Sequence, residues 1–466
     1  MRTWWAMCLI AALAAVATTA SGAAAVAGPA RAGQDIEPSI EQSVEFRSGD
    51  VTLHGTVTAP AGTAGQRRPG IVLVHGSGPE TRAKYRAEAQ AMARSGFVVL
   101  SYDKRTAGYS LTQRSYDRLA DDALAGVRLL NGRADVDPGK VGLWGFSEGG
   151  WVVPLAASRS AQVSYVVLVG ASGVSPARES AWALGNTLRH EGVAGSLLRT
   201  VPVTGTRFLT DAGLLSEADH DPLPALRRVH QPVLALWGDD HKSPPAESAV
   251  AIGKALRDGG NTDVTIRFFP HADHKLHTSS DGFQRGEHLT PGYVDTMASW
   301  VAGHGHRTDD ALPHQARRSH DLAPLPTYEA SAAQAAAFVL MAVSFAAYLL
   351  TELVRRLRSR PCAPGAGRAP RWLAAAELAT LLGFLGYFGF VTMTLTTGPM
   401  LGNRPVCWLV LQFLTAGAAV AAVATVVGWW RARASVPGRT HARLGVLGLT
   451  SALFFPWALF WGLMTP

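Results

Sequence analysis

Residues 141–154, VGLWGFSEGGWVVP, hold the pattern that decides the fold. An apolar run ends at Ser147, and helix-compatible residues follow two glycines. Residues 145–149 read G-x-S-x-G, which forms a sharp turn when a strand precedes it and a helix follows. Glycine is required two residues either side of the serine, because larger side chains would clash in that turn. The pattern predicts a serine hydroxyl raised above the end of a buried strand.

The surrounding region, residues 41–302, alternates between strand and helix patterns. Continuously apolar runs separated by helical segments are typical of a mostly parallel sheet with helices on both faces, an α/β fold. Residues 43–60 alternate like an antiparallel hairpin, and residues 175–228 interrupt the alternation as a predicted helical cap. Strand patterns occur at 70–75, 97–102, 141–146, 164–169, 232–237 and 263–269, and helical patterns at 83–95, 114–132, 148–159, 245–258 and 291–302.

A serine hydroxyl needs a general base, and the base needs an orienting acid. Open parallel sheets place such groups at the carboxyl ends of their strands. His274 is the preferred base among His271, His274 and His277, because it lies in the loop directly after the last strand. Asp240 is the preferred acid, four residues before a proline that would start a helix, and Asp239 is the alternative.

The tetrahedral intermediate of acyl transfer also needs hydrogen-bond donors for its oxyanion. One is expected from the backbone N–H of Glu148, the residue after the serine. The other is expected from the loop VHGSGPETR, where Ser77 N–H is the best candidate. Glycines in that loop would let its backbone approach a substrate.

Residues 41–302 resemble the α/β-hydrolase-fold serine hydrolases, near the dienelactone hydrolases, acyl-peptidases and bacterial esterases. The resemblance rests on LVHGSGPETR, SYDKRTAGYS, the segment around GFSEGG, QPVLALWGDD and FPHADH, in that order. It implies Ser147 as nucleophile, His274 as base and an aspartate after the 232–237 strand. Two positions depart from the family pattern: His241 stands where the acid is usual, and Thr106 replaces a glycine.

The predicted function is hydrolysis of carboxylic esters through an acyl-enzyme, with a small-molecule ester as substrate. A peptidase or thioesterase with the same catalytic triad of serine, histidine and aspartate is the alternative. A catalytically inactive ligand-binding membrane protein is an alternative of another class. No cofactor and no metal site is implied. The net charge of +8 does not favour nucleic-acid binding, because ten arginines in two short loops exceed it.

The C-terminal third predicts a membrane region. Four apolar runs, at about 330–354, 372–396, 406–430 and 444–464, each reach the ~20 residues that span a bilayer. Six arginines fall in 355–371 between the first two runs and four in 431–443 between the last two. Because arginine accumulates on the cytoplasmic side, the first run is expected to enter from outside.

The hydrolase-like region is therefore expected on the extracytoplasmic side of a cell membrane, joined to the membrane region by a linker at 303–329. Residues 1–32 fit this orientation as a secretory signal ending in Ala30-Arg31-Ala32, or as an uncleaved anchor. Four histidines of the linker, His304, His306, His314 and His320, lack the fixed spacing of a metal site. Glu377 is expected to be paired or to reach the membrane boundary near Arg371.

Overall fold

The computed structural model describes residues 39–62, 65–110, 112–239, 243–303, 309–313, 317–358, 368–434 and 436–466. The predicted signal segment, Asp240, His241 and the linker residues His304, His306 and His314 lie outside the described residues. The chain divides into two compact units. One, the α/β unit, contains the described residues from 39 to 183 and from 215 to 321, and the other, the helical unit, contains the described residues of 184–214 and 322–466.

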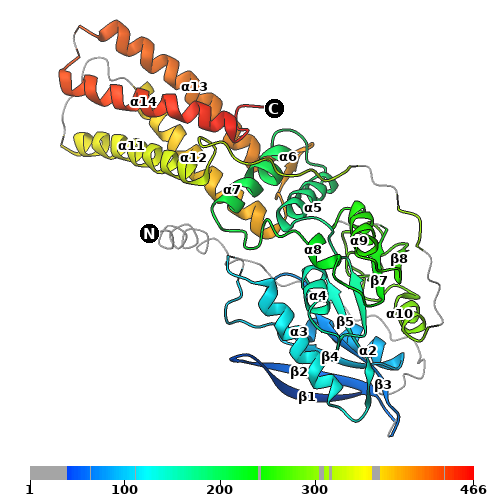
Figure 1. Ribbon diagram of the computed structural model, residues 1–466. Helices are drawn as coiled ribbons and strands as arrows, with labels where there is room; N and C mark the ends of the chain where they lie inside the picture. The colour runs from blue at the N-terminus through cyan, green and yellow to red at the C-terminus, as the bar shows by residue number, and fades with distance from the viewer. Residues whose placement is uncertain are drawn as a thin grey trace, which may run out of the picture. The chain divides into compact units, whose positions relative to one another are not determined.

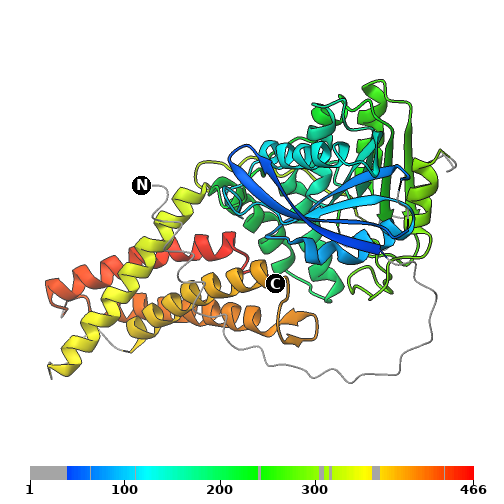
Figure 2. The same ribbon diagram turned by 90° about the horizontal axis from the view of Figure 1, so that it is seen from below.

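An eight-stranded sheet organises the α/β unit, in the order β1-β2-β4-β3-β5-β6-β7-β8. The six strands from β4 to β8 in this order run parallel, whereas β1 pairs antiparallel with β2 and β2 pairs antiparallel with β4. The predicted α/β fold is confirmed, with the predicted hairpin as its antiparallel edge (Figure 2). The strands are β1 Ser39–Ser48, β2 Val51–Pro60, β3 Arg68–Val74, β4 Val98–Tyr102, β5 Val136–Phe146, β6 Tyr165–Val169, β7 Val233–Gly238 and β8 Val264–Phe269.

Helices cover both faces of this sheet (Figure 1). One face packs on apolar side chains of α3, α4, α8 and α9, and the other packs on those of α2 and α10. Strands β6 and β7 are buried along their whole length, because both of their faces are covered. The helices are η1 Arg82–Tyr85, α2 Arg86–Arg94, α3 Tyr116–Asn131, α4 Gly149–Ala157, α8 Leu223–Leu226, α9 Glu247–Asp258 and α10 Tyr293–Val301.

Four long apolar helices form most of the helical unit, and each is long and apolar enough to cross a membrane. Their apolar side chains share one core with aromatic pairs such as Phe384 and Trp461, whose ring centres lie 4.9 Å apart. Glu377 is buried between α12 and α14, where its carboxylate accepts a hydrogen bond of 2.9 Å from Ser451 Oγ. The helices are α11 Ser331–Leu357, α12 Ala369–Thr394, α13 Val406–Ala432 and α14 Gly438–Phe460, and a short hairpin, β9 Met400–Leu401 with β10 Arg404–Pro405, joins α12 to α13.

Residues 184–214 belong to the helical unit, although they lie within the region predicted as a cap. Helix α5 (Pro176–His190) contains the boundary between the units, and α6 (Leu197–Arg199), η2 (Thr200–Gly205) and α7 (Thr206–Asp211) follow it. The apolar side chains Leu188, Leu197 and Val201 are buried in the same core as α11–α14. The predicted cap region is therefore divided, because the middle of it packs on the C-terminal helices.

Polar contacts locate residues 184–214 at one end of the four-helix bundle. Thr200 Oγ1 donates to Trp461 O at 3.0 Å, and Trp408 Nε1 donates to Ser196 Oγ at 3.1 Å. Ala194 N also donates to the carbonyl of Asn403, in the loop between α12 and α13, at 2.8 Å. The arginine-rich loops adjoin the other ends of these helices. The segment therefore lies at the arginine-poor end of the bundle.

Candidate active site

Ser147 lies in a tight turn between β5 and α4. Its φ of 52° is in the left-handed region, which a serine rarely adopts. Ser147 N donates to Val169 O at 3.0 Å, so the turn is also fastened to the neighbouring strand β6. A Cβ at Gly149 would lie 2.5 Å from Val74 O, and one at Gly145 would overlap Gly149 O. Both glycines of the G-x-S-x-G pattern are thus required by close backbone approach.

The loop of residues 76–78, the predicted source of the second oxyanion donor, lies beside the serine. A Cβ added to Gly76 would lie 3.5 Å from Ser147 Cβ. Gly76 N donates to Tyr85 OH at 2.9 Å, Gly78 N donates to Tyr109 OH at 3.0 Å, and Lys104 Nζ donates to Gly76 O. Within the part of the chain that the structure describes, the Ser77 N–H between them donates to no protein acceptor.

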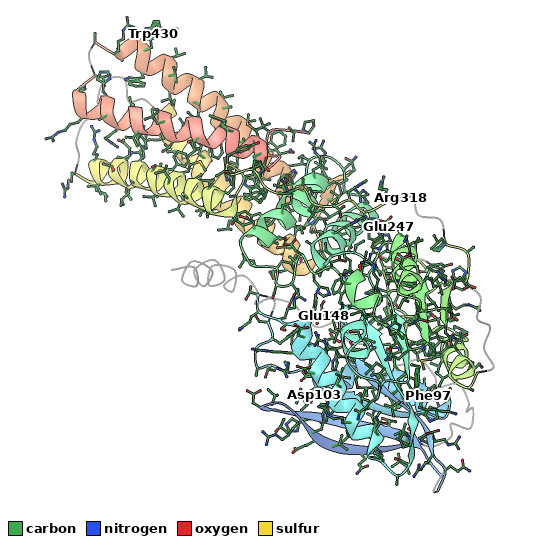
Figure 3. All side chains as sticks on the ribbon, in the orientation of Figure 1. Phe97, Asp103, Glu148, Glu247, Arg318 and Trp430 are labelled. Atoms are coloured by element: carbon green, nitrogen blue, oxygen red, sulfur yellow. The ribbon has the colours of Figure 1, made fainter. Side chains whose placement is uncertain are left out.

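Glu148 carries a fully buried carboxylate at the start of α4 (Figure 3). Its oxygens accept from Lys104 Nζ at 2.8 Å, Tyr109 OH at 2.9 Å and Ser77 Oγ at 3.4 Å, and from Arg114 Nη1. Burial lowers the pKa of the Lys104 ammonium, and the charge of Glu148 opposes that effect. We call Lys104, Tyr109, Arg114 and Glu148 the buried charge cluster.

Sequence reasoning missed the side chains of the buried charge cluster and assigned only the backbone of Glu148. A signal was present in SYDKRTAGYS, where Lys104 and Arg105 follow directly after a buried strand. Two cations at such a position need buried partners, because an unpaired buried charge is costly. Arg105 Nη2 forms an ion pair with Asp122 Oδ1 at 2.6 Å, and Lys104 forms an ion pair with Glu148.

His274 lies in the loop after β8, against the end of β5. Its ring centre is 4.9 Å from that of Phe146, the residue before Ser147. A Cβ added to Gly170, at the end of β6, would lie 2.7 Å from His274 Nδ1. His271 is exposed, and His277 is directed to Glu88 at 3.1 Å. Of the three candidate histidines, His274 is the one that packs on Phe146, at the end of the strand that precedes the serine.

Ion pairs hold the residues on both sides of His274, and the pair made by Lys275 is buried. Lys275 Nζ lies 2.7 Å from Glu88 of α2, and burial lowers the pKa of that ammonium while Glu88 raises it. Asp273 precedes the histidine, and its carboxylate accepts from Arg285 Nε at 2.6 Å. Lys275 is thus fixed to α2, and Asp273 is fixed to a later part of the same loop, which restrains the backbone at His274.

Asp239 connects the loops after β7 and β8. Its N–H donates to Phe269 O at 2.9 Å, and its Oδ1 accepts from His271 N at 2.9 Å. One carboxylate oxygen therefore has a backbone partner other than the His274 ring. Asp240 lies outside the described residues, so the choice between the two aspartates stays a prediction.

Glu179, in the first half of α5, is a partly buried acid near the loop after β7. Its Oε1 accepts from Ser243 Oγ at 2.5 Å. Burial raises the pKa of this carboxyl to about 7, and the charge of Glu148 adds to the effect. Sequence reasoning gave this residue no role, because nothing in its helical pattern marks it.

Comparison with known proteins identifies the α/β unit. Residues 65–223, which include the serine turn, match the family described as serine aminopeptidase, S33. The chain carries a serine hydrolase of the α/β-hydrolase fold. The chain is 25% identical over 291 residues to the esterase EstD of Thermotoga maritima, a match that covers 55% of this chain and 68% of that protein.

Solved structures similar to the hydrolase include two further enzyme types. The acylaminoacyl peptidase of Pyrococcus horikoshii is 20% identical with a TM-score of 0.36, over 50% of this chain and 37% of that one. The dienelactone hydrolase of Anabaena variabilis is 19% identical with a TM-score of 0.35, over 57% of this chain and 96% of that one. The chain thus spans little more than a third of the length of that peptidase.

Proposed function

We propose that this protein is an exported, membrane-anchored hydrolase of carboxylic esters. The observation that carries the proposal is Ser147, held at φ 52° in the turn between β5 and α4. A strained turn of this kind exposes a nucleophile at the edge of the sheet, where open α/β folds bind their ligands. The loop of residues 76–78 and His274 border the same strand end.

The proposed reaction proceeds through an acyl-enzyme. Ser147 Oγ attacks the ester carbonyl while His274 accepts its proton, and the N–H groups of Ser77 and Glu148 bind the resulting oxyanion. The intermediate collapses as His274 returns the proton to the leaving alcohol. A water molecule then gives a proton to His274 and attacks the acyl carbonyl, which forms a second oxyanion. This intermediate collapses as His274 returns the proton to Ser147 Oγ, and the carboxylic acid and free Ser147 are released. Asp240 orients the imidazole, with Asp239 as the alternative acid.

The proposed location follows from charge and from the contacts of residues 184–214. These residues pack on the arginine-poor end of the four helices through Ser196, Thr200 and Ala194. The arginine-rich loops favour the cytoplasmic side, so the end that holds this segment is the extracytoplasmic one. This orientation agrees with the signal pattern of residues 1–32, and it makes the bilayer a partner of the protein.

Peptide hydrolysis is the second candidate, because the matching family is described as serine aminopeptidase. The leaving group of an amide is an amine, and amide hydrolysis needs the same serine, base and oxyanion donors. The two reactions therefore differ in which substrate fits the site. A thioester would also react through this triad. The similarity of the chain to an esterase over 291 residues supports the ester as the first choice.

The test compares substrates on the full-length protein in detergent. A short-chain aryl ester, an aminoacyl anilide and an acyl thioester are offered in parallel, and a fluorophosphonate reports the activated serine. We expect the ester to turn over fastest, and Ser147→Ala to abolish labelling and lower kcat by as much as ~10⁶. Ser43→Ala, an exposed serine of β1, is the matched control and should behave as wild type. A folded wild-type protein that neither labels nor turns over would favour the ligand-binding alternative instead.

A further inference from the structure

We propose that Lys104 is a positioning residue that orients both N–H donors of the oxyanion site. This inference rests on the proposed function. Lys104 follows the end of β4, and its ammonium is buried, with a side-chain exposure of 2%. It contacts the loop that contains Ser77 and the side chain of Glu148, the two residues whose N–H groups are the proposed donors.

The first donor is oriented through a peptide plane. Gly76 O and Ser77 N–H belong to the same peptide unit, and in a trans peptide the two groups point in opposite directions. Lys104 Nζ binds Gly76 O and so fixes the direction of the Ser77 N–H. The ammonium also polarises this peptide, because it draws charge toward the carbonyl oxygen and makes the N–H a stronger donor.

The second donor is held through its own side chain. Glu148 Oε1 lies 2.8 Å from Lys104 Nζ, and this contact bridges two loops that are far apart in the sequence. The third proton of the ammonium is directed to Tyr109 OH at 3.2 Å, and that hydroxyl accepts from Gly78 N at 3.0 Å. All three protons of Lys104 are therefore directed to groups that fix the two donors and the loop between them.

The charge balance of the cluster favours an oxyanion. Lys104 and Arg114 carry two positive charges against the one negative charge of Glu148, and all three side chains are 6% exposed or less. Glu80, the next acid that acts on Lys104, is paired with Lys84 at 2.9 Å. A buried net positive charge stabilises the negative charge of the transition state more than it stabilises the neutral ester.

A structural ion pair would make a different prediction from a positioning residue. If Lys104 only neutralised Glu148, its loss would lower stability, and substrate binding and chemistry would fall together. If it orients the donors, its loss lowers kcat and leaves KM nearly unchanged, because the oxyanion exists only after attack.

The experiment compares Lys104→Met with Arg114→Met in the full-length protein. Arg114 has the same charge and also binds Glu148, but its other contacts are to Ser216 rather than to the 76–78 loop. The measurements are kcat and KM for an aryl ester, the inhibition constant of a trifluoromethyl ketone, and the melting temperature. The ketone forms a tetrahedral adduct with a serine, so its affinity reports the oxyanion donors.

We expect Lys104→Met to lower kcat by about 10²- to 10³-fold, the loss that follows removal of one oxyanion donor, with KM changed less than about threefold. The affinity for the ketone should fall by a similar factor, and Arg114→Met should lose less than about tenfold in each. Equal losses in the two variants, or an unchanged ketone affinity in Lys104→Met, would overturn the inference.

Lys104→Arg decides the question if Lys104→Met does not fold. Arginine keeps the charge but cannot direct three protons to the same three acceptors, so the ketone affinity should still fall at least about tenfold. An unchanged affinity would count against the positioning role. Failure of the proposed function is a separate outcome, because the wild type itself would then fail to react with the fluorophosphonate.

Discussion

Gly170→Ala should displace the proposed base, His274, without changing its side chain. Gly170 directly follows β6 and has a φ of 55°, and a Cβ there would lie 2.7 Å from both Nδ1 and the carbonyl oxygen of His274. Ordinary contacts begin at 3.4 Å, so the histidine must retreat by ~0.7 Å. A displacement of about 1 Å in a catalytic group can cost about 10²-fold, so we expect kcat to fall between about tenfold and 100-fold.

Gly260→Ala is the matched control for this substitution. Gly260 has φ 85° and is exposed beyond the end of α9, with no atom within 4 Å of a Cβ built there. Both variants carry the cost of placing alanine in the left-handed region, about 1–2 kcal/mol, but only Gly170→Ala displaces His274. The melting temperature measures the shared cost, and it should fall in both variants.

Ester turnover and the rate of fluorophosphonate labelling are the two assays. Both should drop in Gly170→Ala and stay within about twofold of wild type in Gly260→Ala. If Gly170→Ala labels and turns over like Gly260→Ala, His274 is not the base, and the proposed triad must be revised.

Three further outcomes are expected. Asp240→Asn should lower kcat on the order of 10⁴-fold, and Asp239→Asn should lower it far less. A large loss of kcat in Asp239→Asn alone would make Asp239 the acid. In a background without the three native cysteines, a cysteine at Arg360 should be shielded from an impermeant thiol reagent in intact cells while one at Asn403 reacts, and the reverse labelling would invert the topology. Glu179→Gln should raise the melting temperature relative to wild type increasingly as pH rises from about 4.5 to about 7, since the folded protein holds a proton there that the unfolded chain has lost; a constant difference would contradict the raised pKa.

Local patterns predicted the parts of the fold that are determined by neighbours in the sequence. The serine turn needs glycines at fixed spacing, and the edge hairpin alternates with period two, so both were readable from short stretches. The strand that precedes each proposed catalytic loop was also found, because buried parallel strands are continuously apolar.

The buried charge cluster was not predictable in this way. Lys104 and Arg114 come from the loop between β4 and α3, Glu148 comes from the start of α4, and no spacing rule joins them. Residues 184–214 were equally hidden, because Leu188 and Leu197 have the same periodicity whether their helix covers an active site or packs on membrane helices. Only the three-dimensional contacts separate those two cases.

The assignment of residues 184–214 to the helical unit has a consequence for the order of folding. Ribosomes add about 5 to 20 residues per second, so α14 is complete roughly 10 to 50 s after residue 214. Until then Leu188, Leu197 and Val201 lack part of the core that buries them. The hydrolase sheet needs only residues before 270, so it can form first. The completion of α14 therefore determines when residues 184–214 can pack fully into their core.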